Sequence, residues 1–183
     1  MTDKLGQAEL RRVFAAFPTG VAAVAALVGD EPAGLAANSF VSVSLDPPLV
    51  SVCIAHSSTT WPALRTAPRL GISVLADHQE TASRQLSSGQ PDRFDGLTWR
   101  ATEDGAILLA EAAAWFDCSI EQEITAGDHD IVVLRVHDLA ASEVMPLVFH
   151  GSTYRQLARS GRAGHLRDTR PHDDRDQRFR LGA

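Results

Sequence analysis

Small polar residues gather at several points where apolar, strand-like runs of this sequence end. Hydroxyl side chains and backbone N–H groups at the start of a helix can hold a phosphate, because the first amides of a helix have no intrahelical acceptor. The run "HSSTTW" at residues 56–61 fits that description with hydroxyls and without a basic residue. It also fits a plain helix start with Ser58 or Thr59 as the N-cap, so both interpretations stand. The clusters are Thr19-Gly20, Asn38-Ser39, Ser57-Ser58-Thr59-Thr60 and Gly127-Asp128-His129.

Other familiar chemistries are not indicated. Asp128, His129 and Asp130 are metal-ligand types, but neighbouring residues of a strand point to opposite faces, so we predict no metal site. The sequence has no GxGxxG after a strand, no GxxxxGK[ST] loop and no GxSxG elbow. A Rossmann nucleotide site, a P-loop and a serine hydrolase are therefore all disfavoured.

Length and charge limit the class of protein. A chain of 183 residues with 44% apolar and 22% charged residues can fill one core. Seven arginines and four aspartates lie from Arg159 onward, so the preceding body carries 10 basic and 19 acidic residues. An acidic body argues against a nucleic-acid partner. We predict one domain over residues 1–158 and a disordered, polar tail over residues 159–183.

The sequence also predicts a cytoplasmic protein without a membrane partner. No apolar run reaches the roughly 18 residues that a membrane-spanning helix needs, and the first residues lack a secretory apolar region. Cys53 and Cys118 lie in separate apolar runs without paired spacing. We interpret them as buried thiols of a reducing compartment.

The elements that must position these residues are mostly strands. Apolar runs punctuated by Gly, Pro, Asn and Asp predict strands at 21–28, 34–45, 49–55, 69–76, 97–103, 113–125, 130–142 and 146–150. Short helices are predicted at 7–17, after Ser58, at 77–88 with Asp77 and Glu80 as a partial capping box, and at 153–158. Such a set of strands favours a mainly β, antiparallel fold that closes into a barrel.

Several segments taken in order carry a family resemblance. "FPTGVAAVAA", "GLAANSFVSVSLDPPLVSVCIA", "HSSTTW", "GISVLADHQ", "RFDG" and "AGDHDIVVLRV" together resemble the short-chain flavin reductases, over residues 10–157. The resemblance implies the FMN-binding split-barrel fold, a split β-barrel with a few short peripheral helices. It also implies a homodimer that binds FMN or FAD, takes hydride from NADH or NADPH, and releases reduced flavin to a partner monooxygenase.

The resemblance also implies roles for individual residues. It places Thr19 and Gly20 beside the isoalloxazine ring and Arg93-Phe94 over the flavin site. His129 would be the catalytic residue, as a nicotinamide positioner or a proton donor, with a simple turn histidine as the alternative. The remaining expected contacts are Ala37, Asn38 and Ser39 along the flavin edge and ribityl chain, Ser57, Ser58, Thr59 and Thr60 at the phosphate, and Gly127 and Asp128 in the nicotinamide turn.

Two positions leave alternatives open. "FHGSTYRQL" retains the family's His150, Gly151 and Tyr154 but lacks its arginine, so Tyr154 is either a cofactor contact or a core-capping tyrosine. Arg93 either meets a phosphate or forms a surface salt bridge. Two other functions remain: an oxidase of the pyridoxamine-phosphate type, which needs basic residues for its substrate, and a flavin carrier without reductase activity.

The strand around residue 41 raises a question of orientation. Small side chains at Asn38 and Ser39 suit a close approach of a flat ligand to the backbone. By alternation we expect Val41, Val43 and Leu45 to face the barrel core. Ser42 and Ser44 would then face a dimer partner or a helix.

Overall fold

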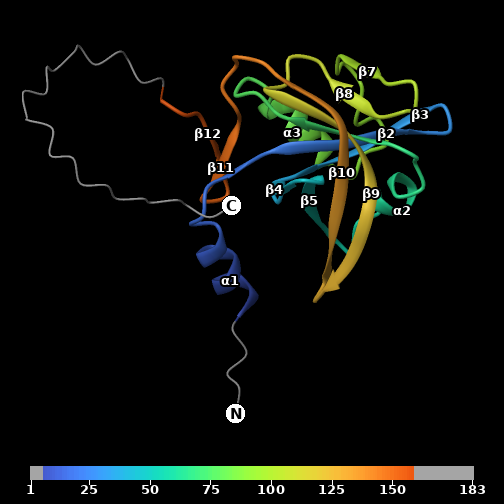
Figure 1. The fold of residues 1–183 in the computed structure, drawn as a ribbon. Helices are drawn as coiled ribbons and strands as arrows, with labels where there is room; N and C mark the ends of the chain where they lie inside the picture. Colours follow the sequence, from blue (N-terminus) through green and yellow to red (C-terminus); the bar gives the residue numbers. More distant parts are fainter. Residues whose placement is uncertain (1–5, 159–183) are drawn as a thin grey trace, which may run out of the picture.

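In the part of the chain that the structure describes, a large antiparallel sheet is joined by two small sheets and three short helices (Figure 1). The computed structural model describes residues 6–158. The large sheet has the strand order β3-β2-β6-β9-β10-β5-β4. Its strands are β2 (Ala22–Val28), β3 (Glu31–Ala37), β4 (Val41–Leu45), β5 (Pro48–Ala55), β6 (Leu70–Val74), β9 (Ala114–Ala126) and β10 (His129–Ala141).

The remaining elements surround this sheet. One small sheet joins β1 (Thr19–Gly20), β11 (Val148–His150) and β12 (Thr153–Arg155), and the other joins β7 (Trp99–Ala101) and β8 (Ile107–Leu109). The helices are α1 (Gln7–Phe14), α2 (Trp61–Leu64) and α3 (Glu80–Leu86). None of the helices in residues 6–158 combines the length and apolarity that crossing a bilayer requires.

Alternating apolar residues of the central strands build the core. Val24, Val52, Ile72, Val132 and Leu134 are fully buried in one cluster inside the curved sheet. Two-residue turns keep the hairpins in register: Gly29-Asp30 joins β2 to β3, and Gly127-Asp128 joins β9 to β10. In each turn the glycine has a positive φ, as the first central position of a type II′ hairpin requires.

A side chain links the two sides of the split in the barrel. Strands β3 and β4 end the sheet, and residues 38–40 carry the chain from one to the other. The Ser39 hydroxyl accepts a hydrogen bond from the Cys53 N–H (2.9 Å) and donates one to the Cys53 C=O (3.1 Å), as a paired strand would. The predicted mainly β split barrel with few short helices is confirmed.

The predicted single strand at 34–45 is wrong. The chain breaks after Ala37, and the two halves lie at opposite ends of the seven-stranded sheet. A continuous run of small and β-branched residues cannot reveal this break, because both halves have the composition of strands.

The predicted orientation of β4 is also wrong. Val41, Val43 and Leu45 are 54%, 50% and 92% exposed in this chain. Strand β4 is an edge strand, and its register against β5 shifts between Ser42 and Ser44. Such a bulge breaks the simple alternation on which the prediction depended.

Three smaller predictions need correction. Residues 153–158 are not helical, because Gly151 and Ser152 both have positive φ and turn β11 back onto β12. Helix α3 begins at Glu80 without a capping box from Asp77. Cys53 is exposed, whereas Cys118 is buried and burial raises the pKa of its thiol to about 12. The tail predicted over 159–183 lies outside the described residues.

Candidate functional site

A groove of about 380 Å³ lies where β3 and β5 end. Its walls come from the residues after β3, the loop after β5, the residues after α3, and the first residue of β10. Eight of the residues expected from the sequence line it: Ala37, Asn38, Ser39, Ser58, Thr59, Thr60, Arg93 and His129. No Asp or Glu is among the lining residues, so the groove holds no carboxylate that would repel an anion.

The loop at 57–60 combines both interpretations of "HSSTTW". The Ser58 hydroxyl accepts the N–H of Trp61 at 3.2 Å and so caps the start of α2. In residues 6–158 the backbone N–H groups of Ser57, Thr59 and Thr60 have no hydrogen-bond acceptor. The loop therefore keeps donors for an anion while its helix is capped. Ser57 lies beside the groove, not in its lining.

Arg93 supplies the basic group that the run 56–61 lacks. Its guanidinium donates to the Thr60 hydroxyl and to the C=O of Gly34 (3.2 Å), and its Nε donates to the C=O of Gln90 (3.0 Å). Within residues 6–158 the Arg93 side chain bonds a hydroxyl and two backbone carbonyls and forms no ion pair, and its contact with a phosphate stays a prediction. Thr60 thus receives an arginine from a loop 33 residues further along the sequence.

His129 enters the groove from the β9–β10 hairpin. Its Nδ1 lies 2.7 Å from the carboxylate of Asp128, and this hydrogen bond holds the pKa of Asp128 below its ordinary value. An ionised carboxylate only accepts, so Nδ1 carries the proton and Nε2 is the nitrogen left for a ligand. Asp128 and Gly127 form the turn and do not line the groove.

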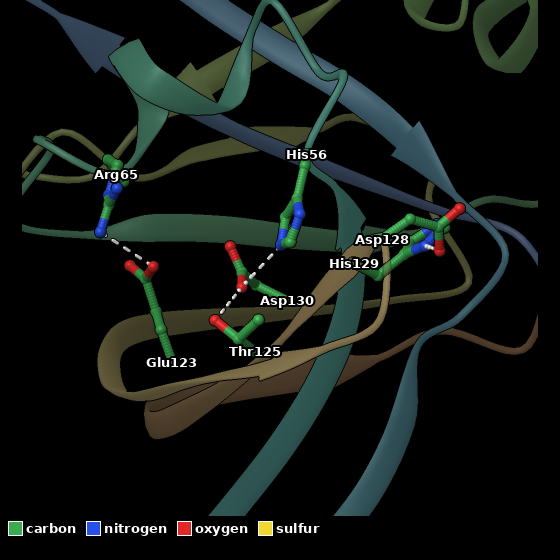
Figure 2. Close-up of polar contacts among 7 residues, drawn as sticks. All are labelled: His56, Arg65, Glu123, Thr125, Asp128, His129 and Asp130. Carbon is green, nitrogen blue, oxygen red and sulfur yellow. Dashed lines mark hydrogen bonds and ion pairs between the residues drawn. The ribbon is translucent and has the colours of Figure 1, made fainter.

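Sequence reasoning missed the hydrogen bonds that join the β9–β10 hairpin to the loop 56–60 (Figure 2). His56 Nε2 lies 3.0 Å from the Asp130 carboxylate, which also accepts the Thr125 hydroxyl at 2.9 Å. The C=O of Asp128 accepts the N–H of His56 at 2.9 Å. A prediction that β5 pairs with β10 would have revealed these bonds, since that pairing brings the residues after Ala55 beside His129.

Other missed residues follow α3. Ser87, Ser88 and Gly89 form part of the groove wall. Their signal was the small-residue run "SSG" directly after a helix. Cys53 also lines the groove from β5.

Tyr154 lies at a neighbouring hollow of about 190 Å³ that shares Ala36, Ala37, Asn38 and Ser87 with the groove. Its hydroxyl hydrogen-bonds Ser83 at 2.8 Å, and the Arg84 guanidinium lies 4.8 Å from the ring centre. Tyr154 therefore covers α3 and also faces the hollow, so both of its predicted roles remain possible.

Three more of the expected residues, Thr19, Gly20 and Phe94, do not line the main groove. Thr19 and Gly20 pair with β11 and line neither the groove nor the hollow at Tyr154, although the Thr19 hydroxyl is buried without a partner. Phe94 packs edge-on against Trp99 and closely against Gly34. A Cβ on Gly34 would lie 2.7 Å from the Phe94 ring, so this contact requires glycine.

Comparison with known proteins decides the family. The family model "Flavin reductase like domain" matches residues 14–158. The chain belongs to this family. A relative from Rhizobium meliloti (strain 1021), named "Probable flavin reductase", is 44% identical over 69% of this chain, but the match spans only 41% of that longer protein. An "NADH-dependent FAD reductase" from Streptomyces globisporus is 39% identical, over 86% of this chain and 90% of its own length.

A solved structure in the family has the same fold. The Streptomyces globisporus NADH:FAD oxidoreductase SgcE6, in complex with NAD and FAD fragments, is 37% identical with a TM-score of 0.81. The match covers 87% of this chain and 98% of that one.

The groove residues fit the flavin that such a family implies. Small side chains form one wall, which leaves room for a flat ring and an extended ribityl chain. Donors converge at the other end, where Thr59, Thr60 and Arg93 suit a phosphate. The assignment of individual residues to ring, chain and phosphate stays a prediction.

Proposed function

We propose that the protein is an NAD(P)H:flavin oxidoreductase, which transfers hydride from a reduced nicotinamide to FMN or FAD. The observation that carries this proposal is one carboxylate-free groove with an anion site at Arg93 and Thr60 and with His129 on another wall. Family membership supports it, as do relatives whose names describe flavin reductases.

The chain's own residues have four tasks in this reaction. Arg93 and the free amides of Ser57, Thr59 and Thr60 bind the flavin phosphate, and the small residues 36–39 leave the ring space to lie flat. A bound flavin supplies the hydride acceptor, so the protein needs no covalent nucleophile. His129 positions the nicotinamide through Nε2. The Asp128 carboxylate fixes the imidazole ring of His129 by accepting the hydrogen bond that Nδ1–H donates. Excluding water from the groove favours transfer between the two cofactors over reaction with solvent.

We further propose that reduced flavin leaves for a partner flavin-dependent monooxygenase. Support comes from relatives such as the reductase subunit HsaB of a flavin-dependent monooxygenase in Mycobacterium tuberculosis, 32% identical over 84% of each chain. A cytoplasmic location remains a proposal too, because the proposed co-substrates, reduced nicotinamide nucleotides, belong to that compartment.

We propose a homodimer because apolar side chains are exposed in two places. Val41, Val43 and Leu45 form a row on the edge strand β4, and Phe14 and Phe17 are 70% and 73% exposed at the end of α1. No residue of helix α1 is buried against the rest of residues 6–158. Apolar surface of this kind marks an interface, and two identical patches can cover each other around a two-fold axis.

Oxidation of NADH or NADPH, followed at 340 nm with and without added flavin, tests the proposal. We expect turnover only when FMN or FAD is present. In His129→Ala we expect kcat/KM for the nicotinamide to fall about tenfold. The control is His137→Ala, which removes an exposed histidine of the same strand that bonds only Ser119. Flavin binding without nicotinamide oxidation would indicate a flavin carrier. Oxidation of an amine substrate with consumption of oxygen would indicate an oxidase.

A further inference from the structure

A second hollow of about 270 Å³ continues the groove on the far side of Arg93. The two share Thr60, Gly89 and Arg93, so they meet at the proposed phosphate site. The second hollow lies between the start of β3 and the loop after α3, and it adds Pro32, Ala33, Gly34, Gln90, Pro91 and Phe94 to its lining.

The Arg93 side chain is held between the two hollows and keeps N–H groups that bond no other group of the described residues. Its Nε and Nη1 bond Gln90, Gly34 and Thr60, while its Nη2 has no acceptor in residues 6–158. Neither hollow is lined by a carboxylate. A half-buried guanidinium that is already oriented and still has free N–H groups is suited to more than one phosphate oxygen.

The walls of the second hollow suit a flat apolar group. Pro32, Pro91 and Phe94 present ring surfaces, and the Phe94 ring is held by its contacts with Gly34 and Trp99. A planar purine gains contact area on such surfaces without needing a charged partner.

We propose that the second hollow is an adenylate subsite and that the preferred flavin is FAD. The flavin half occupies the groove, Arg93 faces the pyrophosphate, and the adenosine lies against Pro91 and Phe94. With FMN the second hollow and the Nη2 donors of Arg93 would have no ligand group to contact. This inference rests on the proposed function, because it assumes that the groove holds a flavin.

Binding, not turnover, is the first readout. Flavin fluorescence titrations of the purified protein should give an FAD dissociation constant at least about tenfold below that of FMN. Gln90→Glu places a carboxylate in the second hollow, at an exposed side chain with no hydrogen bond in the described residues. It should weaken FAD about tenfold, because the new carboxylate repels the pyrophosphate and faces the adenosine, and it should weaken FMN by a smaller factor, because FMN brings only its terminal phosphate to Arg93. Gln122→Glu is the control, since it makes the same change at an exposed position of β9 outside both hollows.

Two further measurements separate the sources of an adenylate group. AMP should compete with FAD but not with FMN. The KM for NADH, measured with FMN as the acceptor, should not change in Gln90→Glu; a rise of several-fold there would mean that the hollow holds the adenylate of the nicotinamide co-substrate, and would overturn the proposal. Equal affinities for FAD and FMN that respond equally to Gln90→Glu would overturn it as well. FAD preference without any nicotinamide oxidation would support the subsite while contradicting the reductase function.

Discussion

Two polar side chains, Arg93 and Ser39, connect the groove to the barrel, and each does so through contacts far apart in sequence. Arg93 joins its own loop to Gly34 of β3 and to Thr60, so one guanidinium both organises the wall and carries the groove's positive charge. Ser39 uses its hydroxyl against both backbone groups of Cys53. The sequence suggested cofactor contacts for both residues, and the structure adds a structural role that does not depend on a ligand.

Replacing Arg93 tests the charge at the anion site. In Arg93→Met we expect the dissociation constant of flavin to rise about 10- to 100-fold, the range for losing charge-assisted hydrogen bonds. Isothermal titration calorimetry with FAD and FMN measures this. Arg100→Met is the matched control, because Arg100 stacks on Trp115 away from the groove. If the flavin affinity of Arg93→Met were unchanged, Arg93 would not be a flavin-binding residue.

Replacing Ser39 tests the link across the split. Ser39→Ala leaves the N–H and C=O of Cys53 without their partner, and we expect a loss of about 1 kcal/mol in the free energy of unfolding. Chemical denaturation followed by tryptophan fluorescence gives the difference. Ser42→Ala, at an exposed position of β4, should have almost no effect. A Ser39 variant as stable as Ser42→Ala would mean that these two bonds contribute nothing measurable.

At the scale of elements, the β9–β10 hairpin and the loop 56–60 behave as one unit. Figure 2 shows His56 pointing from the loop to Asp130 of the hairpin, which Thr125 also contacts, and Arg65 after α2 pointing to Glu123. His129 therefore keeps its place relative to the anion loop through hydrogen bonds between these elements. The hairpin itself depends on Gly127, whose positive φ permits the two-residue turn.

The hydrogen bonds of Asp130 that join the hairpin to the loop should make the stability of the protein depend on pH. The bonds from His56 and then Thr125 hold the pKa of Asp130 below its ordinary value of 3.8. A lowered folded-state pKa stabilises the protein above the unfolded value, and that contribution is lost as the pH falls through the folded-state pKa. Wild type should melt above Asp130→Asn at neutral pH, and the difference should shrink as the pH falls below 3.8. Thermal melts across this range check it, with Asp92→Asn as the control; a pH-independent difference would argue against the linkage.

What the sequence could predict at this scale follows from local pattern. The hairpin at Gly127-Asp128 and the small polar clusters could be predicted, because turn residues and hydroxyl clusters are recognised from a few neighbouring positions in the sequence. The break after Ala37, the bulge in β4 and the bond between Arg93 and Thr60 were not, since each depends on strands or loops that meet only in the folded chain. The predicted helix at 153–158 failed because pairing with β11 outweighed local helix propensity.

At the scale of the whole molecule, the barrel leaves apolar surface that no other part of residues 6–158 covers. We expect Val43→Asp to shift a dimer to monomers, because burying an unpaired carboxylate at an interface is costly. Sedimentation velocity at micromolar concentration gives the mass. Val144→Asp changes a partly exposed valine in the loop before β11 and should leave the mass unchanged. A wild-type monomer would contradict the proposed dimer outright.

The central claim is that the groove brings a reduced nicotinamide and a flavin together for hydride transfer. The most direct test mixes the protein and oxidised flavin anaerobically with NADH or NADPH in a stopped-flow instrument and follows the flavin absorbance. We predict rapid bleaching, slowed when the transferred hydrogen of the nicotinamide is deuterium, and about tenfold slower in His129→Ala. Flavin that binds in the groove and keeps its absorbance with both nucleotides would contradict the account.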